Sequence, residues 1–85
     1  MKNKLLVTVI VPAIEMEYDV YIPNNKMIGT IKQYIITSII ELSHNTFVKP
    51  LNEVCMIDRD RQVEYDNSMY VKDTGIKNGT KLLIM

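Results

Sequence analysis

The stretch "VKDTGIKNGTKLLIM", Val71–Met85, carries the strongest structural signals in this sequence. Asn78 and Gly79 favour a tight turn, because both residue types tolerate a positive φ. In the residues that follow, Leu82 and Ile84 alternate with the side chains at 81, 83 and 85. Such alternation is typical of a strand with one buried face. We therefore predict a turn that leads into a last strand packed on a core.

Two further strands are predicted near the start of the sequence. Residues 5–11 are rich in Val and Ile, as strands often are. Their alternation places four side chains on one face: Leu5, Val7, Val9 and Val11. Residues 17–23 repeat the pattern, with Tyr18, Val20 and Ile22 as the inward positions. A short turn over 12–17 joins the two segments, so we predict a hairpin.

The segment 23–45 has the spacing of an amphipathic helix. Its apolar stripe recurs every three to four residues: Ile28, Ile31, Ile35, Ile39 and Leu42. Asn24 or Asn25 is the expected N-cap, and Lys32 is expected to lie largely off the stripe. The run "IITSII" is β-branched and by itself favours a strand. The longer periodicity decides for a helix, because packing usually overrides intrinsic propensity.

Ile36 and Ile40 lie off this stripe, one helical turn apart, and two interpretations stay open. In the first, the following loop folds over them and covers them with Phe47, Val48 or Leu51. In the second, they line an exposed groove for a partner, because contiguous apolar patches mark contact surfaces.

The rest of the sequence predicts short strands. Residues 53–58 form a third strand, 59–61 a polar turn and 62–65 a fourth strand, before a compact connection leads to the last strand. No repeat, low-complexity tract or linker divides the 85 residues. We therefore expect one α+β domain over 1–85 with the element order β-β-α-β-β-β.

The composition argues against several classes of function. Ten basic and ten acidic residues cancel, which disfavours electrostatic binding to nucleic acid or to anionic lipid. No apolar stretch approaches the roughly 20 residues that span a bilayer, so we expect no membrane insertion. The opening "MKNKLLVTVIVPAI" has the charge pattern of a signal peptide. Its apolar run is short, β-branched and interrupted by Pro12, so we interpret it as a strand.

Residues that could carry chemistry are few. Cys55 is the one cysteine, and we interpret it as a small buried apolar side chain in a reducing cytoplasm. His44 is interpreted as polar surface. The run "DRDRQ" over 58–62 does not match a calcium loop and is interpreted as a charged hairpin tip. We therefore expect no enzyme activity, catalytic residue, metal, cofactor or small-molecule substrate.

The predicted element order and the last fifteen residues resemble the β-grasp, or ubiquitin-like, fold. Ubiquitin-like domains typically carry a Leu-Ser-Asp-Tyr-Gly-Ile type of segment, a polar turn and a final alternating strand. Here Val71 to Ile76 match that segment in order, with these two residues as core anchors, and Asn78-Gly79 matches the turn. The resemblance implies a single mixed sheet packed on one helix, with the strand order 2-1-5-3.

The sequence is also similar to the EsaB/YukD family, small ubiquitin-like proteins that accompany type VII, or WXG-type, secretion systems of Gram-positive bacteria. The similarity rests on the charged hairpin "IDRDRQV" at 57–63 and the ending "KDTGIKNGTKLLIM" at 72–85. It implies a cytoplasmic accessory or regulatory component that acts by binding. Ubiquitin needs a flexible Gly-Gly tail for activation, whereas this sequence stops at Met85 inside a predicted strand. We therefore expect that it is not conjugated to other proteins.

In a β-grasp fold the helix covers one face of the sheet, and alternation predicts that apolar residues gather on the other face. The expected interaction residues are Leu6, Ile10, Met56, Leu83 and Met85. Contiguous apolar patches usually mark contact surfaces, and methionines suit an adaptable contact. Two other interpretations stay open: the alternation slips by one residue, or these side chains are merely scattered over the surface. We expect a protein partner, either a secretion component or a second copy. The alternative function is a self-associating structural β-grasp protein unrelated to secretion.

Overall fold

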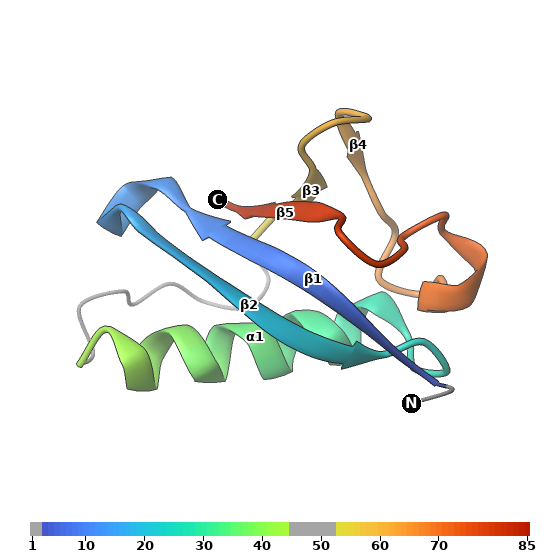
Figure 1. Cartoon of the computed structure of the whole chain (residues 1–85), viewed down its shortest axis with the longest axis horizontal. Helices are drawn as coiled ribbons and strands as arrows, with labels where there is room; N and C mark the ends of the chain where they lie inside the picture. Colours follow the sequence, from blue (N-terminus) through green and yellow to red (C-terminus); the bar gives the residue numbers. More distant parts are fainter. Residues whose placement is uncertain (1–2, 45–52) are drawn as a thin grey trace.

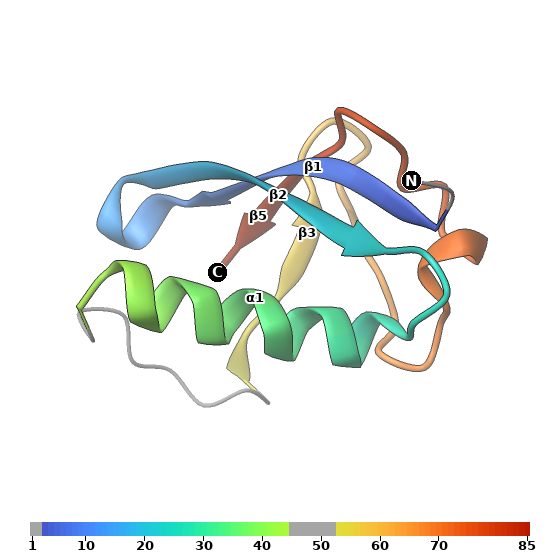
Figure 2. The ribbon, with the colours of Figure 1, turned by 60° about the horizontal axis from the view of Figure 1, so that its bottom comes forward.

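The computed structural model describes residues 3–44 and 53–85, which form a five-stranded sheet with one helix across one face (Figure 1 and Figure 2). The strands are β1 (Lys4–Val11), β2 (Met16–Pro23), β3 (Met56–Asp58), β4 (Val63–Glu64) and β5 (Lys81–Ile84). The helix is α1 (Ile28–Leu42), and short 3-10 turns form η1 (Pro12–Ile14) and η3 (Val71–Asp73).

The strand order is β2-β1-β5-β3-β4. The central pair β1 and β5 is parallel, and the other neighbours are antiparallel. Because β1 and β5 are neighbours, the first and last strands of the chain form the middle of the sheet. The predicted β-grasp order of elements and of strands is confirmed.

The core lies between α1 and the face of the sheet that α1 covers. Its members from β1 and β5 are predicted inward residues: Val7, Val9, Val11, Leu82 and Ile84. The expected anchors of the connection before β5, Val71 and Ile76, are also buried. On β2, Ile22 is buried, whereas Tyr18 and Val20 are half-buried on this edge strand. Burial of this apolar surface, at roughly 25 cal/mol per Å², is the main stabilising contribution.

Helix α1 buries four of the predicted stripe residues: Ile28, Ile31, Ile35 and Ile39. The prediction is wrong for Leu42, which is the last helical residue and is 54% exposed. Periodicity gives the angle of a side chain around the helix but not the point at which the opposing surface ends. No helix in the two described ranges has the length and apolar content that crossing a bilayer requires.

Lys32 was expected off the stripe, and the structure corrects this, because only 5% of it is exposed. Its Nζ donates a hydrogen bond of 2.9 Å to the carbonyl of Val54, which is also buried. The aliphatic stem of a lysine can pack on apolar neighbours while the ammonium group bonds to a polar atom. The helix therefore buries a wider face than its apolar residues alone indicate.

Neither Asn24 nor Asn25 caps the helix, contrary to the prediction. The N-cap position is Met27, and no side chain caps it. Asn24 takes part in backbone pairing instead, because its N–H donates to Asn3 at 2.8 Å and its carbonyl accepts from Lys72 at 2.9 Å. This residue thus continues the hairpin edge and holds η3 in place.

Two backbone carbonyls from a distant segment bind the start of α1. The Ile28 N–H donates to the carbonyl of Met69 at 2.7 Å, and the Gly29 N–H donates to the carbonyl of Asn67 at 3.0 Å. The first N–H groups of a helix have no partner within the helix. The segment after β4 therefore satisfies donors for which a side-chain cap was predicted.

The two apolar residues beside the stripe are largely shielded. Ile36 is 6% exposed, and Ile40 is half-buried and packs against the core. An exposed groove is therefore wrong for Ile36. The residues predicted to cover this pair fall within 45–52, outside the described residues.

Candidate protein interface

The sheet face opposite α1 presents an apolar row that crosses three strands. Ile10 on β1 is in register with Leu83 on β5, and Leu83 is in register with Ile57 on β3. Residues directly opposite one another in adjacent strands share a face. All three are half-buried, and each alternates with buried neighbours on its strand. This row, Ile10–Leu83–Ile57, is hereafter the apolar strip, and the face that carries it is the outer face.

Met85 widens the apolar strip along β5. It lies two residues after Leu83, on the same face, and is 50% exposed. Its backbone exchanges two hydrogen bonds with Cys55, of 3.0 and 3.4 Å, so the two residues face each other across the ladder. Cys55 is half-buried, which is more exposed than predicted.

Leu6 lies on the outer face but is separated from the apolar strip. Thr8 stands between Leu6 and Ile10 on β1, and its Oγ1 donates a hydrogen bond of 2.7 Å to Asp19 Oδ1. Leu6 is 37% exposed and is in register with Tyr21, which is 53% exposed. Leu6 and Tyr21 therefore form a second, smaller apolar spot beyond a polar row.

Met56 is not on the outer face, which corrects the prediction. It is fully buried and in register with Ile84, which is also fully buried. Its neighbour Ile57 takes the outer position in its place. The sequence is misleading here because Asp58 is charged and yet lies on the inward side of β3, where only 2% of it is exposed. A polar residue at an inward position conceals the alternation of this short strand.

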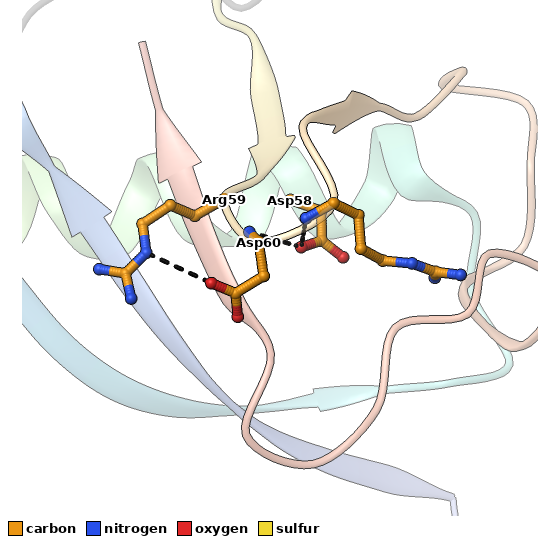
Figure 3. Close-up of polar contacts among 4 residues, drawn as sticks. Asp58, Arg59 and Asp60 are labelled. Atoms are coloured by element: carbon orange, nitrogen blue, oxygen red, sulfur yellow. Dashed lines mark hydrogen bonds and ion pairs between the residues drawn. The ribbon is translucent and has the colours of Figure 1, made fainter.

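The carboxylate of Asp58 fixes the hairpin that carries Ile57. Its Oδ1 accepts from the backbone N–H groups of Asp60 and Arg61 at 3.2 and 3.3 Å (Figure 3). Its Oδ2 accepts a hydrogen bond of 3.1 Å from the Tyr65 hydroxyl. Burial raises the pKa of Tyr65. The hydrogen bond to Asp58 and the negative charge of Asp58 raise this pKa further, and Arg61 opposes the shift. Three donors thus compensate the burial of this carboxylate.

Charged residues lie at both ends of the apolar strip and at the hairpin tip. Ile10 is in register with Glu17 on β2, and Ile57 is in register with Glu64 on β4, and both glutamates are exposed. At the hairpin tip, Arg59 Nε lies 3.7 Å from Asp60 Oδ1 (Figure 3). The outer face therefore has an apolar centre and a charged rim, which is the usual organisation of a protein-binding surface.

The described residues show no metal-binding constellation. Within 3–44 and 53–85, no three His, Cys, Asp or Glu side chains come together as ligands. His44, which the sequence places on the surface, is exposed there.

Comparison with known proteins identifies the fold. No family model and no curated protein matches the chain. The ubiquitin-like domain of an Arabidopsis thaliana protein is similar, with a TM-score of 0.71, 17% identity, and coverage of 98% of this chain and 77% of that one. The ubiquitin-like domain of the Mycobacterium tuberculosis type VII secretion system protein ECCD1 has a TM-score of 0.71 and 13% identity, covering 96% and 97%.

A third structure, a chain of the MycP5-free ESX-5 inner membrane complex, is similar with a TM-score of 0.74 and 10% identity. The alignment covers 98% of this chain and 21% of that one. At these identities the similarity establishes the ubiquitin-like β-grasp fold and leaves function to be argued from the site.

Proposed function

We propose that this chain is a non-enzymatic ubiquitin-like binding module, and that it serves in the cytoplasm as an accessory or regulatory component of a type VII secretion system. It acts by docking its outer face on a protein partner. The single observation that carries the proposal is the apolar strip, which lies on the face of the sheet that α1 leaves uncovered.

The energetic argument rests on burial of the apolar strip and Met85. Contiguous apolar surface on a small domain marks a contact surface more often than chance placement. At roughly 25 cal/mol per Å², burial of a few hundred Å² stabilises a complex by several kcal/mol before association costs are subtracted. The assignment to secretion is supported by the similarity to the ECCD1 ubiquitin-like domain and by the resemblance of the charged hairpin and the last fifteen residues to the EsaB/YukD family.

The test compares three tagged chains in the native cells by chemical crosslinking and mass spectrometry. They are the wild type, the Leu6→Asp/Leu83→Asp double variant and Leu42→Asp. Leu42 is an exposed leucine on α1, so its variant adds negative charge away from the outer face. We expect the wild type and Leu42→Asp to capture a secretion component, and the double variant to capture at least about tenfold less.

Circular dichroism of the purified chains separates loss of binding from loss of fold. We expect the double variant to keep the wild-type spectrum, because Leu6 and Leu83 lie on the outer face. Equal capture by all three chains would show that the outer face is idle. Capture that depends on the outer face but contains no secretion component would refute the assignment to secretion.

A further inference from the structure

The apolar strip ends in a glutamate at each edge of the sheet, on β2 and on β4. The complete row contains one residue from each strand: Glu17, Ile10, Leu83, Ile57 and Glu64. Among the described residues, the ion pair Arg59–Asp60 involves neither glutamate. The next row along the strands contains both Asp19 and Lys81 and has no single sign. Each end of the strip is therefore marked by a glutamate that is in no ion pair among the described residues.

We infer that the occupant of the apolar strip is an amphipathic helix that lies across the strands and carries Lys or Arg at both of its ends. This inference rests on the proposed function, because it takes the outer face as the docking surface. It adds the shape, direction and charge of the partner segment.

The length of the row fits a helix of this kind. Neighbouring strands lie about 4.8 Å apart, so four steps from Glu17 to Glu64 span about 19 Å. A helix rises 1.5 Å per residue and covers that span in about 13 residues. Its apolar face, at the i, i+4 and i+7 spacing, lies on the strip, as in other helix-in-groove contacts. A cation near each end then meets one glutamate.

A second copy of this chain is a poorer occupant. If one strip lies on another in the same direction, Glu17 meets Glu17 and Glu64 meets Glu64. If the strips run in opposite directions, each Glu17 meets the Glu64 of the other copy. Both arrangements place like charges at both ends of the strip, and such contacts disfavour a partner. The charge pattern therefore selects a cationic partner over self-association.

Two synthetic peptides of about 15 residues test the inference by fluorescence anisotropy at low salt. They share one leucine face and differ at both ends, which are lysine in the first and glutamate in the second. We expect the wild-type chain to bind the lysine-ended peptide about tenfold more tightly, because two rim ion pairs become two repulsions in the other peptide. The Glu17→Lys/Glu64→Lys variant should reverse this preference.

Single variants supply a matched control. Glu17→Lys and Glu64→Lys should each reduce the preference by about tenfold, so that each single variant binds the two peptides about equally. Glu41→Lys makes the same change of charge on α1 and should leave the preference unaltered. Binding of the glutamate-ended peptide by the doubly reversed variant demonstrates that this variant is folded.

Four results would overturn the inference. They are equal affinity for the two peptides, no binding of either, a preference that charge reversal does not alter, and a wild-type dimer in analytical ultracentrifugation that Leu83→Asp dissociates. None of these results depends on what the chain captures in cells. If cellular capture still requires Leu83 while the peptides fail, the proposed function stands and the helical partner is wrong.

Discussion

Lys32 Nζ donates a hydrogen bond of 2.9 Å to the carbonyl of Val54, and both residues are buried, with 5% and 2% of their surfaces exposed. The bond joins the first half of α1 to the segment that leads into β3. It gives the carbonyl of a buried residue a hydrogen-bond partner, and it fixes the helix against the chain entering the sheet.

Replacement of Lys32 by Ala should therefore lower the free energy of unfolding by about 2–3 kcal/mol, from the lost buried hydrogen bond and the lost packing of the stem. Urea denaturation measures the effect. Gln33→Ala, at the exposed neighbouring position, should change stability by less than about 0.5 kcal/mol. Equal effects of the two changes would argue that the buried bond contributes nothing.

Met56 and Ile57 are adjacent in sequence but lie on opposite faces of the sheet. Met56→Ala should cost about 2–4 kcal/mol, because it leaves a cavity in the core. Ile57→Ala should cost about 1 kcal/mol or less, because its side chain is only partly buried on the outer face and leaves no enclosed cavity. Urea denaturation of the two variants compares them directly, and the opposite ranking would reverse the assignment of the faces of β3.

Tyr65→Phe removes one of the three donors to the Asp58 carboxylate. Hydrogen bonds to charged groups contribute about 1.5–3 kcal/mol, so we expect a loss near the lower limit because two donors remain. Chemical denaturation at neutral pH measures this loss. A variant as stable as the wild type would mean that Tyr65 stabilises the hairpin by packing alone.

Alkaline pH should weaken the fold through Tyr65. Burial and Asp58 raise its pKa above the ordinary value of 10.0, so the folded state holds the proton more tightly than the unfolded chain does. The resulting stabilisation is complete below the unfolded pKa and is lost as pH rises through the folded pKa. The wild type should therefore lose more stability than Tyr65→Phe as pH rises above about 10. Burial also raises the pKa of Tyr18, so this residue causes a similar loss of stability in the wild type and in Tyr65→Phe, and the comparison isolates Tyr65.

Gly75 and Gly79 both have positive φ, of 86° and 90°, but differ in their surroundings. A Cβ at Gly75 would contact the Arg61 guanidinium, whereas the space beside Gly79 is open. Gly79→Ala should cost about 1 kcal/mol from backbone strain alone. Gly75→Ala should cost more, because it also displaces Arg61 from the Thr74 carbonyl at 3.4 Å.

A double-mutant cycle isolates that contribution. In an Arg61→Ala background, thermal denaturation should give equal costs for alanine at Gly75 and at Gly79. A difference that persists without the Arg61 side chain would assign the extra cost to the backbone of the turn.

The sequence predicts the fold well where inward positions are apolar throughout, as on β1 and β5. On β3 the inward Asp58 interrupts the apolar pattern, so the sequence predicts Met56 on the outer face, one residue out of step with the structure. The carboxylate is tolerated there because the hydroxyl of Tyr65, seven residues later on the far side of the hairpin, donates a hydrogen bond to it. Only the folded hairpin shows this compensation.

The start of α1 and the ends of the apolar strip were missed for a related reason. Backbone carbonyls satisfy the first helical N–H groups, and every residue has a carbonyl, so the sequence contains no signal for the contact. From the sequence alone, Glu17 and Glu64 are indistinguishable from other charged surface residues. Their positions at the two ends of one row follow from strand register, which local alternation does not specify.

The hydrogen bonds from Ile28 and Gly29 to Met69 and Asn67 bear on how the domain is made. While the polypeptide is emerging from the ribosome, the helical segment is synthesised before its acceptors. Its first two N–H groups gain these acceptors only after the hairpin β3–β4 and the following segment as far as Met69 have been synthesised. Amide exchange at these two positions therefore reports the docking of the segment after β4 on the helix, and not the formation of the helix alone.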